Sequence, residues 1–514
     1  MLSQKDSEQL NANGITSEQF ADQIKKFRQG IIPARLIAAA QPGNGIILTT
    51  EKTRKYYLNL FDDYSNDRDI VKFVPASGAA SRMFKDMYSC LHELQQNPND
   101  QQSILDKCPK VKEIFSRINE FAFYPDLFKL LQEQGMDLHQ LINDKKYDTI
   151  ISFILNEKGL NYGNLPKALL NFHDYSKRQR KAIDEHLVEG VLYAINASGL
   201  VNIHFTISPE HEEEFNKQMA FSVSHYEHKF GIRIKIDTSY QHPSTDTIAV
   251  DMNNDVCRNT DNSIVFRPAG HGALIKNLNE LSGDLIFIKN IDNITTDRLK
   301  PTTTEFKKVM AGILIDKEIS INGNLAILMD DGCSTADINE IASFVINDML
   351  VTMPPDFQKM PIDKQRHVLI NKLNKPIRVC GMVRNEGEPG GGPFFVENSH
   401  GITSLQIVES AQVDMNDPEQ VNIFKQSTHF NPVDIVANTV DFLGRKFNLN
   451  DFVDHDTYMI SEKSMNGKPI KALELPGLWN GAMAGWITYF VEVPLETFSP
   501  VKEINDLLRE PHKS

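Results

Sequence analysis

Residues 70–85, IVKFVPASGAASRMFK, decide the fold of this chain. The first five letters form a β-branched and aromatic run that is typical of a buried strand. The run leads directly into a loop of small residues, Pro75 to Arg82, and helix-forming sequence follows the loop. Such a strand, loop and helix can turn backbone amides toward a phosphate, because small residues permit close approach. The same letters also fit a tight turn without a ligand.

Strands and helices alternate through the rest of the chain. Short apolar runs with strand character are separated by amphipathic stretches of helical length. This alternation predicts an α/β fold with a mixed, mainly parallel sheet and helices on both faces. The strand-like runs are 201–207, 232–236, 284–290 and 376–380, and the helical stretches are 183–197 and 209–229.

Helical sequence interrupts this alternation in two places. Between about residues 86 and 158, apolar residues recur at helical spacing and glycine is scarce, and a second helix-rich stretch covers about 303–373. We therefore expect two helical insertions within an α/β domain of residues 71–514. Ahead of that domain, residues 1–70 are predicted to form an N-terminal helical segment.

The composition is that of a soluble globular protein and excludes several classes. A formal net charge of −14 argues against a surface that gathers nucleic acid or anionic lipid through clustered cations. The five cysteines are scattered and none is in a Cys-x-x-Cys spacing, so we expect reduced thiols. No secretory core and no stretch of ~18–20 apolar residues is present. We expect a cytoplasmic protein without a membrane or nucleic-acid partner, and the sequence leaves its oligomeric state open.

Two lysines follow prolines at the head of apolar stretches. Lys167 comes after Pro166, and Lys502 comes after Pro500 and Val501. Because proline fixes its own backbone φ, a lysine beside it presents a flexible point charge from a set position, as phosphate binding requires. Each lysine taken alone fits an exposed surface position better than a phosphate site.

A sharp loop with two glycines follows the strand-like run at 264–266. It reads RPAGHGAL from Arg267, and Gly270 and Gly272 flank His271. Glycines let backbone atoms approach a flat base closely and hydrogen-bond its edge, so this loop is a candidate base-binding loop. The alternative is a turn beside a structural histidine.

Asp292 stands where the run at 284–290 ends. Ligands of open α/β sheets bind at the carboxyl ends of strands, where a carboxylate can hold Mg²⁺. A helix cap is the competing role.

A second glycine-rich loop, 388–393, carries Gly391 and Gly392 between prolines. Its backbone freedom suits a ligand or a lid, and the sequence does not say which ligand.

The order of these pieces resembles the UDP-sugar pyrophosphorylase family of the nucleotidyltransferase superfamily. PASGAASRM resembles the family's glycine-rich triphosphate loop, LPKALL its Pro-Lys element, and FRPAGHGAL its base-binding loop. FIKNIDN is similar to its metal-binding strand, HFNPVDIV to its His-Phe-Asn-x-Asn segment, and ETFSPVKEINDLL to its closing motif. The amino-acid sequences of these motifs are most similar to the family called domain of unknown function 4301. The ordered motifs span most of residues 71–510.

The resemblance implies a role for each motif. Nucleotide contacts are expected from Ala76, Ser77, Gly78 and Ser81 in the first loop and from Gln241, Gly270, His271 and Gly272 near the base. Catalytic contacts to phosphates are expected from Arg82, Lys167 and Lys502, and Mg²⁺ is expected on Asp292. Sugar contacts are expected from Asn431, Gly391 and Gly392.

The resemblance also implies a Rossmann-like, GT-A-like fold and a nucleotidyltransferase. Such an enzyme moves a nucleoside monophosphate, with UMP expected, from a nucleoside triphosphate to a sugar phosphate and releases pyrophosphate. Two alternatives stay open. One is a GT-A-type glycosyltransferase that uses a nucleotide sugar, with Asn290-Ile291-Asp292 as its metal motif. The other is a non-catalytic protein that binds nucleotide sugars, which the missing glycine pair in the first loop favours. The base and the sugar are not set by the sequence.

Overall fold

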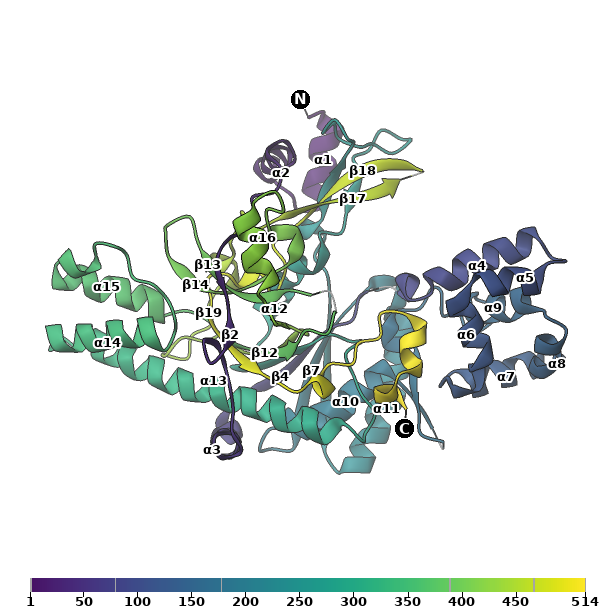
Figure 1. The fold of residues 1–514 in the computed structure, drawn as a ribbon, viewed down its shortest axis with the longest axis horizontal. Coiled ribbons are helices and arrows are strands. Elements are labelled where there is room, and N and C mark those ends of the chain that lie inside the picture. The colour runs from purple at the N-terminus through teal and green to yellow at the C-terminus, as the bar shows by residue number, and fades with distance from the viewer. Residues whose placement is uncertain (1, 79, 177, 388–389, 466, 514) are drawn as a thin grey trace. The chain divides into compact units, whose positions relative to one another are not determined.

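The computed structural model describes residues 2–78, 80–176, 178–387, 390–465 and 467–513. Its chain forms two compact units (Figure 1). Unit 1 holds residues 1–71, 241–288 and 307–493, and unit 2 holds residues 72–240, 289–306 and 494–514. In the described part of the chain, no helix is both long enough and apolar enough to cross a membrane.

Unit 2 contains three neighbouring strands in the order β4 (Ile70–Pro75), β7 (Leu200–Ile207) and β8 (Arg233–Tyr240), of which β4 begins two residues before the unit does. β7 and β8 are parallel along their whole length, from the pair Leu200 and Arg233 to the pair Ile207 and Tyr240. The helix α11 (Glu212–Phe230) connects them, which is the crossover that parallel strands require. The helix α10 (Ala182–Tyr193) precedes β7 and is buried over most of its surface.

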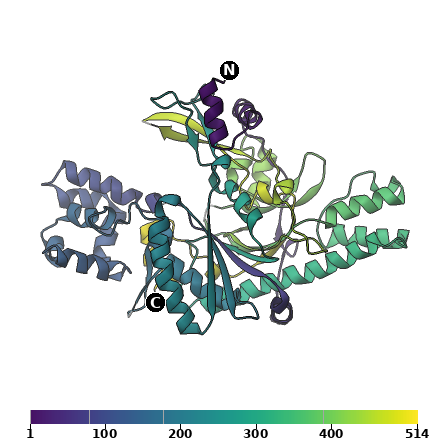
Figure 2. The same cartoon turned by 180° about the vertical axis from the view of Figure 1, so that it is seen from behind.

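Six helices of unit 2 gather into one helical group, which both views show (Figures 1 and 2). They are α4 (Lys85–Gln96), α5 (Gln101–Lys107), α6 (Pro109–Ser116), α7 (Tyr124–Glu133), α8 (Leu138–Asn143) and α9 (Tyr147–Leu155). The group occupies the place in the chain where the helical spacing of the sequence predicts an insertion.

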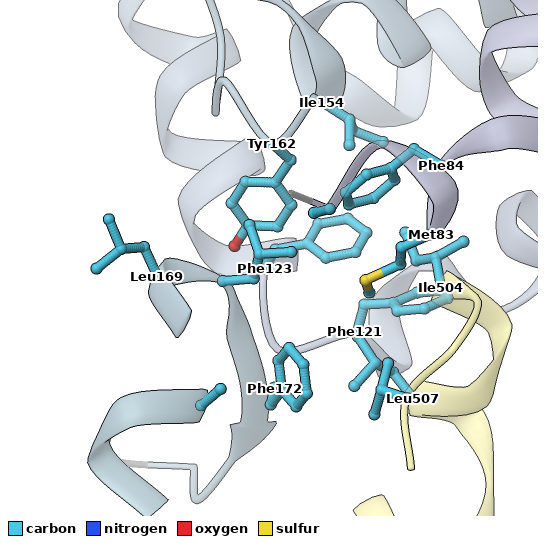
Figure 3. Packing of buried hydrophobic residues seen from close by; sticks show 14 of the residues in the cluster. Met83, Phe84, Phe121, Phe123, Ile154, Tyr162, Leu169, Phe172, Ile504 and Leu507 are labelled. Carbon is cyan, nitrogen blue, oxygen red and sulfur yellow. The ribbon is translucent and has the colours of Figure 1, made fainter. Parts of the chain in front are cut away.

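An aromatic cluster joins the helical group to the C-terminal segment (Figure 3). Phe121 stacks on Phe123 with ring centroids 4.9 Å apart, and Phe123 meets Tyr162 edge to face at 5.7 Å. Ile504 and Leu507 pack into the same buried cluster. Burial of these apolar side chains holds the end of the chain against the segment that follows β4.

Unit 1 contains a larger set of neighbouring strands. In spatial order they are β2 (Gln41–Pro42), β3 (Gly45–Ile47), β19 (Ile487–Glu492), β12 (Ile377–Arg384), β16 (Asp434–Asn438) and β11 (Leu285–Lys289), and β15 (His429–Phe430) also pairs with β12. β19 is parallel to both β12 and β3, whereas β16 is antiparallel to β12. The predicted α/β fold with a mixed, mainly parallel sheet is therefore confirmed.

Three helices of unit 1 fill the second helix-rich stretch. They are α13 (Lys300–Met329), which enters the unit at residue 307, α14 (Thr335–Asn347) and α15 (Ile362–Leu373). Ser334 starts α14 with a capping box, in which its side chain and that of Asp337 each accept from the other's backbone N–H. Asp348, the residue that follows α14, accepts a hydrogen bond from Tyr489 of β19 at 2.9 Å.

Two smaller sheets complete unit 1. One has the order β10 (Phe266–Arg267), β9 (Thr247–Val250), β18 (Lys468–Glu474) and β17 (Met459–Met465), and the other has the order β1 (Arg35–Ala39), β13 (Gly392–Glu397) and β14 (Thr403–Val408). The remaining helices are α1 (Gln4–Ala12), α2 (Ser17–Gln29), α3 (Glu51–Tyr64), α12 (Ile275–Glu280) and α16 (Pro418–Lys425).

The N-terminal segment contains strands as well as the expected helices. β1 pairs with β13, so Arg35 faces Glu397 across more than three hundred residues of sequence. α1 and α2 bury Leu10 and Phe27 in a cluster with Ile248 of β9. Short strands that depend on such distant partners carry little local signal, which is why sequence reasoning found only the helices.

Candidate functional site

Lys167 is the centre of a cluster of motif residues in unit 2. It begins a single helical turn, Lys167–Leu169, directly after the extended Pro166. Its Nζ donates to Asp292 Oδ2 at 2.7 Å and to the Val501 carbonyl at 2.6 Å. The side chains of Lys167 and Asp292 are 15% and 21% exposed, so the pair is partly shielded from water without being closed off. One ammonium thus joins three motifs that are far apart in sequence.

The end of β11 runs beside the C-terminal motif. The Asp292 carbonyl accepts from Val501 N–H at 3.0 Å, and Asn293 and Pro500 form an isolated bridge. The buried side chain of Asn293 accepts from Ser499 N–H at 2.9 Å. These backbone contacts fix the segment 499–501 against the strand end that carries Asp292.

Asp506 orients the backbone around Lys502. Its Oδ2 accepts from the N–H groups of Lys502 and Glu503, both at 2.8 Å, and so caps the helical turn Ile504–Leu508. The Lys502 side chain itself is exposed. The ammonium of Lys502 therefore projects from a backbone that is held at several points.

The first loop reaches the same C-terminal segment. Ala76 N–H donates to the Thr206 carbonyl at 2.9 Å, and Ser208 Oγ donates to the Ser77 carbonyl at 3.0 Å. After the turn Ala80–Arg82, the carbonyl of Met83 accepts from Ile504 N–H at 3.3 Å. Gly78, Ser81 and Arg82 are exposed, and Ala79 lies outside the described residues. Arg82, Lys167, Asp292 and Lys502 are thus tied into unit 2 by backbone contacts of neighbouring residues.

A buried ionic bridge lies beneath these loops. Lys72, three residues before Pro75, donates to Glu189 Oε2 at 3.0 Å, and Lys289, three residues before Asp292, donates to Glu189 Oε1 at 2.8 Å. All three side chains are at most 1% exposed. Burial lowers the pKa of Lys72 to about 7. Burial alone would raise the pKa of Glu189, but Lys289 and Lys72 hold it well below its usual value.

The candidate base-binding loop belongs to unit 1 and is tightly packed. Gly270 has φ +75°, a conformation that favours glycine, and a Cβ on Gly272 would lie 2.2 Å from the Pro476 carbonyl oxygen. The His271 ring stacks on Trp479 at 3.9 Å, and its Nδ1 accepts from Leu478 N–H at 3.0 Å. Burial lowers the pKa of His271, which fits a neutral ring that accepts at Nδ1. The structural role that the sequence left open for His271 is therefore present.

Gln241, also in unit 1, has an unused donor. Its Nε2 is buried and has no hydrogen-bond partner among the described residues. A buried donor without a partner costs free energy, so such a group calls for an explanation. The resemblance places this side chain near the base, and an acceptor on a base edge would satisfy it.

Asn431 and the second glycine-rich loop come together in unit 1. Asn431 N–H donates to the Gly391 carbonyl at 2.8 Å. The Asn431 side chain donates to the Gly381 carbonyl at 2.8 Å and accepts from Val433 N–H at 3.0 Å. A Cβ on Gly391 would lie 2.5 Å from Ile407, and one on Gly392 would lie 2.7 Å from Phe394. Glu388 and Pro389 lie outside the described residues. The Asn431 side chain therefore holds the backbone at Gly381 and Val433 in place. Its expected sugar contact stays a prediction.

A magnesium ion at Asp292 would depend on the substrate for most of its ligands. Among the described residues, no three His, Cys, Asp or Glu side chains form a group that could hold a metal. Mg²⁺ commonly keeps several waters and binds through one or two carboxylates together with substrate phosphates. Asp292 fits that pattern, because its carboxylate is partly exposed and its hydrogen bond to Lys167 uses Oδ2.

Sequence reasoning missed two residues of this cluster. Asn293 and Asp506 lie inside motifs that carry the family resemblance, and the sequence predicts no role for either residue. In the structure, their side chains hold the backbone at Ser499 and Lys502. The available signal was their position: each is a short polar side chain beside a proline-anchored lysine motif or a strand end.

Taken together, these contacts define an α/β protein in which Lys167 pairs with the carboxylate of Asp292 just after a strand end. The chain belongs to the family described as Domain of unknown function (DUF4301), whose model matches residues 3–513. No curated protein matches the chain significantly.

Solved structures that are similar to this chain include the following three. The uridine diphosphate N-acetylglucosamine pyrophosphorylase of Trypanosoma brucei is 11% identical, with a TM-score of 0.46 and coverage of 99% of this chain and 79% of that one. A UDP-glucose pyrophosphorylase mutant of Leishmania major is 13% identical, with a TM-score of 0.45 and the same coverage. A UDP-glucose phosphorylase of Trypanosoma brucei is 12% identical, with a TM-score of 0.42 and coverage of 98% and 77%.

Proposed function

We propose that the protein is a nucleotidyltransferase of the nucleotide-sugar pyrophosphorylase type. It transfers a nucleoside monophosphate, with UMP as the first candidate, from a nucleoside triphosphate to a sugar phosphate and releases pyrophosphate. The observation that carries the proposal is the contact of Lys167 Nζ with Asp292 Oδ2 at 2.7 Å and with the Val501 carbonyl at 2.6 Å, next to Lys502. Two cations and a carboxylate from three separate motifs suit a reaction between two polyanions.

In the proposed reaction, an oxygen of the sugar phosphate attacks the α-phosphorus of the triphosphate in line. The bond from the α-phosphorus to the oxygen that bridges to the β-phosphorus breaks, and pyrophosphate leaves with the bonding electrons. Arg82, Lys167 and Lys502 neutralise the charge that collects on the phosphate oxygens. No protein nucleophile is required.

Asp292 is the proposed metal ligand. When bound, Mg²⁺ would supply a Lewis acid that neutralises phosphate charge. Asp292 would hold the ion through its carboxylate, and Lys167 beside it would contact a phosphate oxygen. Both side chains are partly exposed, at 21% and 15%, so a ligand can reach them.

Base recognition is proposed for residues of unit 1. The unpartnered Nε2 of Gln241 would donate to a carbonyl of the base, and the backbone at Gly270 and Gly272 would hydrogen-bond its edge. Gly391, Gly392 and Asn431 remain the proposed sugar contacts.

A glycosyltransferase and a non-catalytic binding protein are the rival functions. A glycosyltransferase would need the metal motif at Asp292 but would leave Lys167 without a task. Pyrophosphate exchange separates the proposed function from both rivals: only a pyrophosphorylase incorporates labelled pyrophosphate into nucleoside triphosphate when it is given the correct nucleotide sugar. Screening nucleotide sugars by thermal stabilisation first identifies that substrate, because a ligand that binds only the folded protein raises the melting temperature. Stabilisation without exchange would contradict the proposed function and favour the two rivals.

A further inference from the structure

A cavity of about 540 Å³ in unit 1 is lined in part by the candidate base-binding loop. Gly272 and Ala273 of that loop form part of its wall, and residues of α2 form another part. This volume is in the range of small-molecule sites. The apolar part of its lining comes from Ile275, Val453, Leu473, Leu475, Pro476 and Ala482.

Two opposite charges line the same cavity without pairing. Asp246 is half-buried, and among the described residues no hydrogen bond or ion pair reaches its carboxylate. Burial raises the pKa of Asp246. Lys276 is also half-buried and donates to Ser244 Oγ at 2.8 Å, which uses one of its three N–H donors. A carboxylate and an ammonium kept apart in one cavity would each gain from a ligand group of the opposite charge.

The other charges of the lining argue against a purely anionic ligand. The lining also carries the charged or titratable residues Glu18, Asp22, Lys26, His455 and Asp456. Lys26 is already paired with Asp22 at 2.8 Å, so the carboxylates of Glu18 and Asp456 add negative charge to the lining. An anion alone would meet these carboxylates and Asp246, whereas a cation alone would leave Lys276 without an anionic partner.

We propose that this cavity binds a small zwitterion with an apolar body, such as an apolar α-amino acid. The ammonium of the ligand pairs with Asp246, its carboxylate pairs with Lys276, and its side chain covers the apolar lining. The ligand touches the loop that holds Gly270 and Gly272. That loop is rigidly seated, because Gly272 has no room for a Cβ against the Pro476 carbonyl. An effect of the ligand on nucleotide affinity rests on the proposed function, but its binding does not.

The test is calorimetric binding to the full-length protein near neutral pH. The probes are L-leucine, L-methionine and L-phenylalanine, with 4-methylpentanoate and 3-methylbutylamine as leucine analogues that lack one of the two charges. At least one amino acid is expected to bind, and for leucine each analogue is expected to bind at least about tenfold more weakly, because each loses one charged contact. No binding by any of the three amino acids, or equal binding by either analogue, would overturn the proposal.

Two variants test the assigned contacts. Asp246→Asn and Lys276→Met are each expected to weaken binding of the tightest amino acid by at least about tenfold. Asp255→Asn and Lys468→Met change exposed residues of the same unit outside the cavity lining and should bind normally. Unchanged affinity in either cavity variant overturns the assignment. Because binding is measured without turnover, its failure is distinct from a failure of the proposed enzyme activity.

Discussion

The backbone carbonyl of Asp292 accepts a hydrogen bond from the N–H of Val501 at 3.0 Å. This one contact sets the C-terminal motif beside the end of β11, and Lys167 reinforces it by donating to both the Asp292 carboxylate and the Val501 carbonyl. Lys502 follows directly in the chain. The proposed function depends on this arrangement of Asp292, Lys167 and the C-terminal motif. Substitution of single residues tests it.

The carboxylate of Asp292 is expected to be essential for turnover and nearly neutral for stability. Asp292→Asn should lower kcat/KM by about 100-fold or more and raise the Mg²⁺ concentration that gives half-maximal rate, because an amide is a weaker metal ligand. Loss of the partly exposed ion pair with Lys167 should cost only roughly 1 kcal/mol of unfolding free energy. The control is Asp144→Asn at an exposed position of unit 2. An unchanged metal dependence in Asp292→Asn would rule out Asp292 as the ligand.

The candidate base-binding loop is expected to lose nucleotide affinity when Gly272 gains a side chain. In Gly272→Ala the new Cβ would clash with the Pro476 carbonyl, so the loop must shift. We expect the nucleotide Kd to rise at least about tenfold, which corresponds to about 1.4 kcal/mol. The matched control is Gly323→Ala in α13, where no atom lies within 4 Å and the helix should gain roughly 0.5–1 kcal/mol. Equal nucleotide affinity in both variants would separate this loop from base binding.

The buried bridge under the site is expected to govern stability rather than chemistry. Glu189→Gln removes the counter-charge of two lysines that are at most 1% exposed. Breaking a buried ion pair on one side typically costs about 3–5 kcal/mol. Urea unfolding should show that loss, whereas Glu157→Gln at an exposed position should show almost none. A change in the free energy of unfolding near zero for Glu189→Gln would contradict this expectation, because it would mean that Lys72 and Lys289 find other partners.

His512 is expected to make stability depend on pH. Its Nδ1 lies 2.9 Å from His173 Nε2, and burial lowers its pKa from 6.5 to about 3. Because the unfolded chain takes up a proton near pH 6.5 and the folded chain does not, stability falls as pH drops below that value. Between about pH 7.5 and pH 5 the loss from this group is about 2 kcal/mol. His512→Asn should remove it, and identical pH profiles for the two proteins would contradict the assignment.

Local sequence signals predicted the elements around the site well. The β-branched run at 70–74 lies within β4, and the run at 201–207 lies within β7. Lys167 follows the extended Pro166 as the sequence shows, and its phosphate contact stays a prediction. These features depend on the spacing of apolar residues, on strand and helix propensity, and on the fixed backbone angle of proline. A short stretch of sequence contains all three signals.

Side-chain partners could not be predicted in the same way. The strand β1 pairs with β13, where Arg35 lies opposite Glu397, and the Asn431 amide donates to the distant Gly381 carbonyl. His271 likewise owes its environment to Trp479, more than two hundred residues later. Each contact is decided by tertiary packing, which the residues near it in sequence do not encode.

The most direct test of the account is the initial rate of labelled pyrophosphate exchange into nucleoside triphosphate, measured with a panel of nucleotide sugars and Mg²⁺. The wild-type protein, Lys167→Met and the exposed control Lys158→Met are compared in parallel. We predict exchange with at least one nucleotide sugar, a loss of about 100-fold or more in Lys167→Met, and no loss in Lys158→Met. Exchange that survives unchanged in Lys167→Met, or wild-type protein that binds nucleotide sugars without any exchange, would contradict the proposed function.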